Sequence, residues 1–172
     1  MVHREAQASS ARPLYTAAER RRRDESPWTE VQGVLAPVQF LVFLVSLFLV
    51  LRYLTSGEGA DVATASVVIK TLVLYAIMVT GAIWEKVVFG RYLFAPAFFW
   101  EDVFSMLVLL LHTWYLVAVF QNWYGVAGQL WLALAAYAAY VVNAAQFVWK
   151  LRLARQEAHR GRSPALASGV VQ

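Results

Sequence analysis

Residues 31–54 read VQGVLAPVQFLVFLVSLFLVLRYL, and this stretch decides the fold class. Arg52 is its only charged side chain. A helix of this length rises about 36 Å at 1.5 Å per residue, and the hydrocarbon core of a bilayer is about 30 Å thick. The stretch therefore predicts a membrane-spanning helix.

Three further apolar stretches follow, at 61–88, 97–120 and 126–149. The chain is 60% hydrophobic and 15% charged, whereas soluble domains are about 45–50% apolar and about 25% charged. The connections are short, which favours antiparallel neighbours. We predict an all-α, integral membrane, four-helix up-down bundle over residues 31–149, with a disordered basic tail at 1–30 and a second basic tail at 150–172.

The lysines and arginines predict the orientation of the bundle, because they are retained on the cytoplasmic side. Thirteen of the 15 fall in the two tails and the middle connection: Arg4, Arg12, Arg20 to Arg23, Lys86, Arg91, Lys150, Arg152, Arg155, Arg160 and Arg162. Arg52 stands alone on the other side, and Lys70 lies within a span. Both termini are therefore expected in the cytoplasm, with no nucleic-acid partner, since the positive charge sits in tails.

Several cofactor sites are excluded by the residue content. The chain has no cysteine and three histidines, of which only His112 lies within a span. Iron–sulfur and thiolate metal sites need cysteine, and di-iron bundles need paired Glu-x-x-His motifs. We expect no resident cofactor and no metal site in the protein.

Polar side chains recur in the cytoplasmic half of all four predicted spans: Gln39, Glu85, Glu101, Asp102, Asn143 and Gln146. Ionisable groups at membrane depth usually face the bundle interior or a wet cavity. Other readings remain open. Glu85 pairs with Lys86 or Arg91 at the interface, one of Glu101 and Asp102 lies among headgroups, or Asn143 and Gln146 only hold helices together.

Two basic side chains lie nearer the outer side. Lys70 and His112 are each about two turns from the outer end of antiparallel neighbouring spans, so they can share a depth. Lys70 can instead extend to the outer interface. His112 can be a packed histidine that bonds a backbone carbonyl, or it can be a metal ligand.

Two segments carry a family resemblance: QGVLAPVQFLVFLVSLFLVLRYLTSGEG at 32–59, and VVIKTLVLYAIMVTGAIWEKVVFGRYLFAPAFFWEDVFSMLVLLLHT at 67–113. They closely resemble the 2-vinyl bacteriochlorophyllide hydratase family, also called 3-vinyl bacteriochlorophyllide hydratase. The resemblance covers about residues 28–149, and the tails do not contribute to it.

This resemblance implies a hydro-lyase of bacteriochlorophyll synthesis in a photosynthetic inner or intracytoplasmic membrane. Water would add to the 3-vinyl group of chlorophyllide a or its bacteriochlorin relative and give a 3-(1-hydroxyethyl) product. The substrate brings its own magnesium. Membrane lipid and other bacteriochlorophyll-synthesis enzymes are the remaining expected partners.

The chemistry of vinyl hydration suggests roles for particular residues. Protonating the terminal carbon leaves a cation beside the ring, so the site needs an acid, a water molecule and negative charge. A carboxyl group in an apolar pocket can hold its proton near neutral pH. We expect Glu101 as the acid and Asp102 or Glu85 as counter-charge and base.

The remaining candidates would bind the substrate. His112 is the expected axial ligand of its magnesium. Lys86 and Arg91 are expected at its propionate, Trp100 and Trp114 on its faces, and Gln39 and Asn143 in the pocket wall. Two alternative functions stay open: a non-catalytic chlorophyllide-binding scaffold, and an assembly subunit of a photosynthetic complex.

Overall fold

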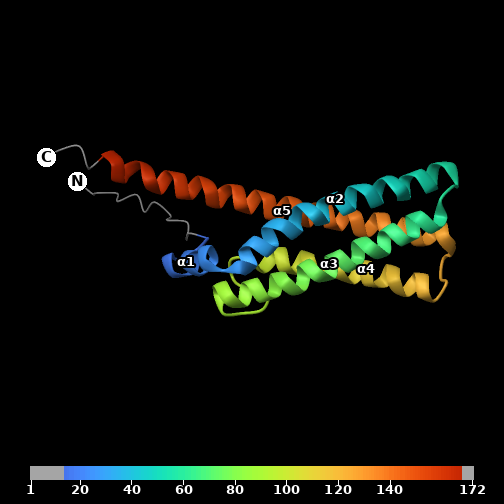
Figure 1. The fold of residues 1–172 in the computed structure, drawn as a ribbon, viewed down its shortest axis with the longest axis horizontal. Coiled ribbons are helices and arrows are strands. Elements are labelled where there is room, and N and C mark those ends of the chain that lie inside the picture. The colour runs from blue at the N-terminus through green and yellow to red at the C-terminus, as the bar shows by residue number, and fades with distance from the viewer. Residues whose placement is uncertain (1–13, 168–172) are drawn as a thin grey trace, which may run out of the picture.

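The protein is a bundle of long helices with one short helix packed at one end. The computed structural model describes residues 14–167, with side chains for all of these except 154 and 157–167. The helices are α1 (Ala17–Glu25), α2 (Pro27–Ser56), α3 (Ala60–Phe89), α4 (Phe99–Phe120) and α5 (Gly125–Ala167). Figure 1 places α1, the 90–98 connection and the last turns of α5 at the same end of the bundle, here called the tail end.

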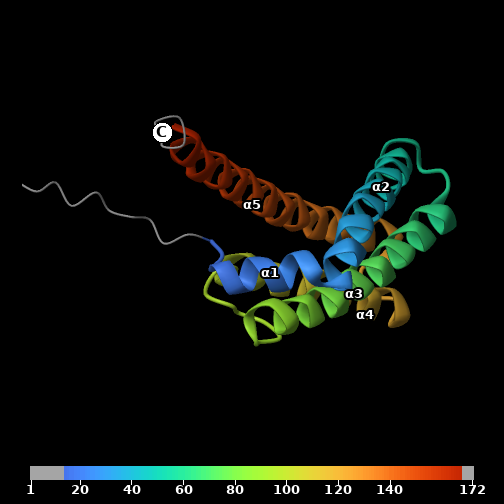
Figure 2. The ribbon, with the colours of Figure 1, turned by 60° about the vertical axis from the view of Figure 1, so that its left-hand side comes forward.

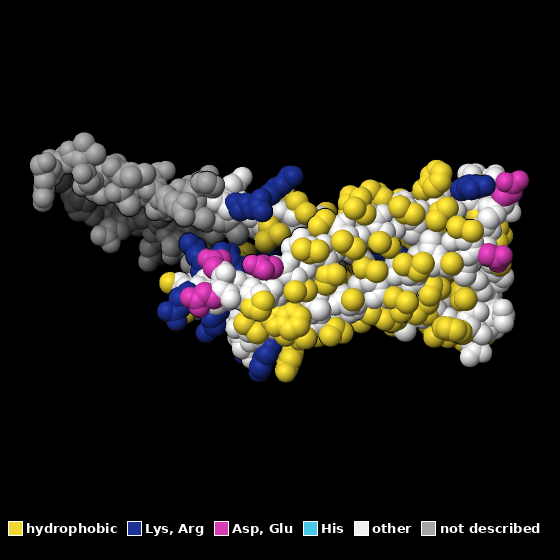
Figure 3. Space-filling model, viewed as in Figure 1, with side chains coloured by type: hydrophobic (Ala, Val, Ile, Leu, Met, Phe, Trp, Pro, Cys, Tyr) yellow, Lys and Arg dark blue, Asp and Glu magenta, His cyan; other side chains and the backbone are white. Residues whose placement is uncertain are grey.

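Four of the helices are long and apolar enough to cross a bilayer: Pro27–Ser56, Ala60–Phe89, Phe99–Phe120 and Gly125–Leu153. Hydrophobic side chains cover the middle of the surface, while charged ones gather at the two ends (Figure 3). The predicted all-α class with four candidate membrane spans is confirmed. The side of the membrane on which the tail end lies stays a prediction.

The ends of these helices follow local sequence signals. Ser26 caps the start of α2 and Pro27 takes its first position, where a proline loses no hydrogen bond. Gly57 and Gly90 end α2 and α3 in the left-handed conformation, with φ of 75° and 81°, which glycine adopts without steric cost.

The bundle core is a set of stripes that face inward from each helix. On α2 the buried residues are Gln39, Phe43, Ser46 and Val50, a spacing that places them on one helix face. The Phe43 ring packs on Tyr137 and Tyr140 of α5, with centroids 5.3 and 4.9 Å apart. The Ser46 hydroxyl lies 2.6 Å from that of Tyr137.

The segment expected to be a disordered tail contains helix α1. Thr16 and Glu19 form a reciprocal capping box at its start, which satisfies two otherwise unpaired backbone donors. Tyr15 is buried against Phe89 and Phe98, and Arg22 Nε donates to the Val88 carbonyl at 2.8 Å. Figure 2 shows α1 lying across the ends of the longer helices. Residues 1–13 lie outside the described part.

The second predicted tail also continues a helix, because α5 runs on to Ala167. It extends beyond the other helices at the tail end (Figures 1 and 2). Residues 168–172 lie outside the described part.

Candidate active site

Two carboxyl groups meet at the tail end of the bundle. Glu85 comes from the last turns of α3 and Asp102 from the first turn of α4, and they are 6% and 4% exposed. The chain reverses after Gly90, so these two turns lie against each other. The two groups are close enough to act electrostatically on each other. Two like charges in one buried site repel each other, which favours a state in which only one of the two carboxyl groups is ionised.

The connection between α3 and α4 closes over this pair. The Phe94 backbone N–H donates to Asp102 Oδ2 at 2.6 Å, and the Ala95 N–H donates to Glu85 Oε2 at 3.3 Å. Phe94 holds a φ of 59° to do so, a conformation that costs a non-glycine residue about 1–2 kcal/mol. The carboxyl pair therefore fixes the connection, and the connection orients the carboxyl pair.

The third carboxylate lies beside this pair. Glu101 is 7% exposed, and its Oε2 accepts from Lys150 Nζ of α5 at 2.6 Å. Glu101 and Lys150 both act electrostatically on Asp102. Three carboxyl groups and one ammonium therefore form a cluster that is more acidic than basic.

A groove of about 530 Å³ opens beside this cluster, between the tail-end parts of α4 and α5. Ligand pockets for small molecules span about 300–1,000 Å³. Its lining is Glu101, Val142, Ala145, Gln146, Trp149, Lys150 and Leu153. The groove is thus an apolar surface with charged groups at one edge, which suits a flat apolar molecule with a polar substituent.

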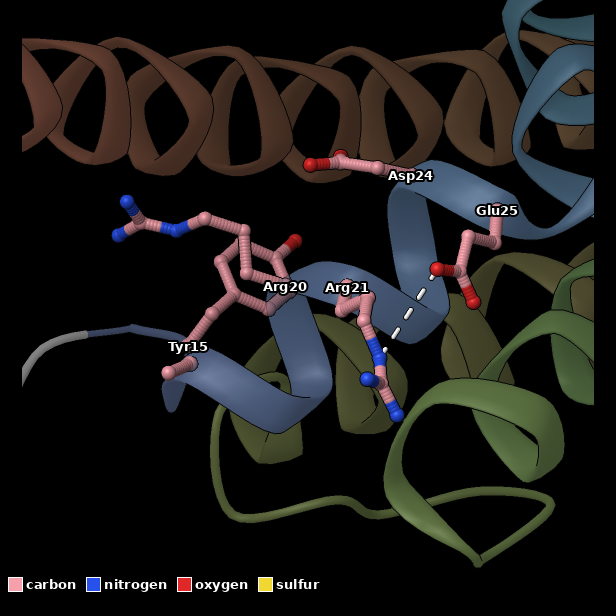
Figure 4. Close-up of a pocket in the computed structure, with 6 residues that line it drawn as sticks. Tyr15, Arg20, Arg21, Asp24 and Glu25 are labelled. Atoms are coloured by element: carbon pink, nitrogen blue, oxygen red, sulfur yellow. Dashed lines mark ion pairs between the residues drawn. The ribbon is translucent and has the colours of Figure 1, made fainter.

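A second depression of similar volume lies along α1. Figure 4 shows its lining by Tyr15, Arg20, Arg21, Asp24 and Glu25, with Arg21 paired to Glu25 at 3.8 Å. Its charges are mixed and it lies outside the candidate spans, so it does not suit a large apolar ligand.

Gln39 and Asn143 are both buried in the bundle. Asn143 Nδ2 donates to Ser105 Oγ of α4 at 2.9 Å, which places Asn143 about one turn beyond Asp102 along α4. Gln39 is 2% exposed, and neither atom of its amide has a hydrogen-bond partner among the described residues.

His112 and Lys70 do share a depth, in a cluster separate from the carboxyl groups. Both are fully buried, with Lys70 Nζ 2.5 Å from His112 Nε2 and His112 Nδ1 2.7 Å from the Val108 carbonyl. Both ring nitrogens are therefore engaged, and neither is free for the magnesium of a substrate. This geometry fits the alternative in which His112 bonds a backbone carbonyl. Lys70 does not extend to the outer interface.

The other candidate binding residues lie on the outside. Lys86 and Arg91 are exposed at the tail end, with Lys86 Nζ bonded to the Gly90 carbonyl rather than to Glu85. Trp100 and Trp114 are 66% and 47% exposed. Trp114 packs on Trp123 toward the far end of α4, so the structure does not bring it to the carboxyl cluster.

Lys150 is the site residue that sequence reasoning missed, because it was assigned to the C-terminal tail. Asn143, Gln146 and Lys150 are spaced three and four residues apart, which puts them on one face of a helix. That spacing was the signal in the sequence that could have placed Lys150 on the same helix face as the polar residues of the fourth span. Among the described residues, no group of three or more His, Cys, Asp or Glu side chains can hold a metal ion.

Comparisons with known proteins identify the family. A family model described as 2-vinyl bacteriochlorophyllide hydratase matches residues 15–153. A 2-vinyl bacteriochlorophyllide hydratase of Rhodobacter capsulatus is 64% identical over 152 residues, covering 88% of each chain. One from Cereibacter sphaeroides is 65% identical over 149 residues, covering 86% of this chain and 92% of its own. No solved structure matches. The chain belongs to the 2-vinyl bacteriochlorophyllide hydratase family.

Proposed function

We propose that this protein is a membrane-embedded hydro-lyase of bacteriochlorophyll synthesis. It adds water to the ring vinyl group of a bacteriochlorophyllide or chlorophyllide and forms a 1-hydroxyethyl group. Two relatives that are 64% and 65% identical bear the name of this activity. The vinyl group numbered 2 in that name is numbered 3 in current tetrapyrrole nomenclature.

The buried Glu85–Asp102 pair is the observation that carries the mechanism. In this proposal one of the two carboxyl groups holds a proton, because two like charges in one buried site repel each other. The proton is transferred to the terminal vinyl carbon, so the double bond is replaced by a C–H bond and a cation on the inner carbon. The oxygen of water then bonds to that carbon, and the proton released by water returns to the carboxyl pair.

Glu101 supplies the negative charge that stabilises the cation. Its Oε2 accepts from Lys150 Nζ at 2.6 Å, and a hydrogen bond between charged groups is about twice as strong as one between neutral groups, so the carboxylate is held at the edge of the groove. This reverses the expected roles: the protonated member of the Glu85–Asp102 pair is the acid, and Glu101 is the counter-charge.

The α4–α5 groove is the proposed binding surface for the macrocycle. Its apolar residues and Trp149 can cover one face of a flat ring, while Glu101 lies at its edge. The exposed Lys86 and Arg91 lie at the same end of the bundle and can attract the propionate of the substrate. Magnesium enters as part of the substrate, and we propose no resident cofactor.

The location follows from the charge distribution. We propose that the tail end faces the cytoplasm, in the inner or intracytoplasmic membrane. An apolar substrate then reaches the groove from the lipid phase, and the enzymes acting before and after hydration can meet it on the same face.

Conservative variants of the carboxyl pair test this function. Glu85→Gln and Asp102→Asn keep the shape of each side chain and remove its carboxyl proton, so hydration in isolated membranes should fall about 10²–10⁴-fold. Cells that carry these variants as the only copy should accumulate 3-vinyl pigment. Matched controls are Glu58→Gln and Asp61→Asn at the far end of the bundle, which should hydrate normally.

The result also separates the hydratase from the alternative of a pigment-binding scaffold. A scaffold would bind pigment without converting it, and neither carboxyl variant would change the pigment profile of the cell. Full hydration by both variants would remove the proposed mechanism.

A further inference from the structure

Gln39 is a buried amide whose hydrogen-bonding capacity is unused. It is 2% exposed, and both Nε2 and Oε1 lack a partner among the described residues. Leaving one such group unpaired costs about 1–3 kcal/mol, so a side chain kept there only for packing would be more stable as leucine. The position therefore points to a polar molecule that binds the amide.

The packing of α2 on α5 identifies what faces Gln39. Gln39 lies one turn before Phe43, whose ring contacts Tyr137 and Tyr140 of α5. The two helices run in opposite directions, so the turn of α5 that follows Tyr140 lies at the depth of Gln39. Asn143 is on that turn, on the same helix face as Tyr140.

Asn143 also has an unused atom. It is buried, and its Nδ2 donates to Ser105 Oγ, while its Oδ1 has no partner among the described residues. No direct hydrogen bond joins Gln39 to Asn143. The unpartnered amide of Gln39 and the unpartnered Oδ1 of Asn143 lie at one depth, where a single water molecule can bridge them.

The position of this pair relative to the carboxyl groups gives it a role. Ser105, the partner of Asn143, lies three residues after Asp102, so the two share one face of α4 about one turn apart. A water between Gln39 and Asn143 would therefore lie about one turn of α4 from Asp102. An amide is neither acidic nor basic near neutral pH, so these two side chains can hold a water molecule without removing its proton.

We propose that Gln39 and Asn143 bind the water molecule consumed in hydration. Gln39 donates from Nε2 to one lone pair, Asn143 accepts one water proton at Oδ1, and the second lone pair stays free. That lone pair forms the C–O bond with the inner vinyl carbon, and the remaining proton passes to the carboxyl pair. This inference rests on the proposed hydratase function and adds residues that hold the second reactant.

Leucine substitutions provide a test with opposite effects on stability and turnover. In detergent-solubilised protein, Gln39→Leu should leave the midpoint of thermal unfolding unchanged or higher, because an unpaired amide is removed. Its kcat should fall at least hundredfold, while pigment binding, followed by absorbance titration, changes less than twofold. Asn143→Leu should lose turnover in the same way, and Gln39→Asn should recover part of it.

Gln32→Leu is the matched control on the same helix. Gln32 already has a partner, since its Nε2 donates to Thr80 Oγ1 at 2.7 Å. Its removal should lower the unfolding midpoint and leave kcat unchanged, which is the reverse of the Gln39 result.

Two outcomes would overturn the inference. Normal kcat in both Gln39→Leu and Asn143→Leu would show that neither residue holds the reacting water. Loss of pigment binding in step with turnover would show that they contact the macrocycle instead. If these variants stay active while Glu85→Gln and Asp102→Asn do not, only the water site fails; if the carboxyl variants also stay active, the proposed catalytic mechanism fails.

Discussion

Lys70 and His112 form a buried pair in the middle of the bundle, with Lys70 Nζ 2.5 Å from His112 Nε2. The Val108 carbonyl accepts from Nδ1, so Nε2 is the acceptor and Lys70 the donor. Lys70 Nζ also lies 4.3 Å from the centre of the Tyr140 ring. The pair joins α3, α4 and α5 well away from the carboxyl cluster, which indicates a role in packing.

Removing one member of this pair should destabilise the protein. His112→Ala leaves the Lys70 amine buried without its acceptor, at a cost of about 1–3 kcal/mol. The double variant Lys70→Met with His112→Leu should recover most of that loss, because both polar groups are gone. Thermal unfolding in detergent measures both, with Thr113→Ala as a neighbouring control.

The single variant Lys70→Met tests whether His112 binds magnesium. It frees Nε2 of His112, so a ligand role predicts tighter pigment binding in that variant. A packing role predicts lower stability and unchanged pigment affinity.

Lys150 should control the position of Glu101. Lys150→Met removes the side chain that holds the Glu101 carboxylate, so turnover should fall about tenfold, which corresponds to about 1.4 kcal/mol. Lys150→Arg should retain most of the activity. Equal turnover in the wild type and Lys150→Met would mean that Glu101 does not stabilise the cation.

The backbone of Phe94 should respond to the type of side chain placed there. Its φ of 59° is accessible to asparagine and unfavourable for β-branched residues. Phe94→Asn and Phe94→Val both lose the ring that packs on Phe99, so their difference isolates the backbone. The asparagine variant should be more stable than the valine variant by about 1 kcal/mol. Equal unfolding midpoints would show that the backbone at position 94 is not strained.

Docking of α1 depends on Arg22. Arg22→Met removes the bond to the Val88 carbonyl, so α1 should detach more often and trypsin should cut its remaining arginines faster. Arg20→Met, an exposed neighbour on the same helix, is the control. Unchanged cleavage in Arg22→Met would mean that Tyr15 alone holds α1 in place.

Hydropathy was sufficient to predict the four candidate spans, because each contains a predominantly apolar run of membrane length. It also placed Glu85, Glu101 and Asp102 at one level. It did not predict which face each helix turns inward, because a helix that is apolar all round offers no stripe to orient it. The outward positions of Trp100 and Trp114 follow from that rotation.

Contacts between distant residues were harder to predict. The Glu101–Lys150 bond joins residues 49 positions apart, and it depends on α5 remaining helical past the apolar run. Helix α1 was missed because its composition is that of a solvated tail. Its capping box and its contact with the ends of α3 and α4 outweigh that polarity.

The length of α5 has a mechanical consequence. Its 43 residues rise about 65 Å at 1.5 Å per residue, roughly twice the hydrocarbon thickness of a bilayer. The part beyond the bundle is thus a stiff rod, and a rod fixes a distance where a flexible tether sets only an average. A fluorescent reporter fused directly after Ala167 would be held at a set height above the lipid surface, and energy transfer to a membrane dye would measure that height directly.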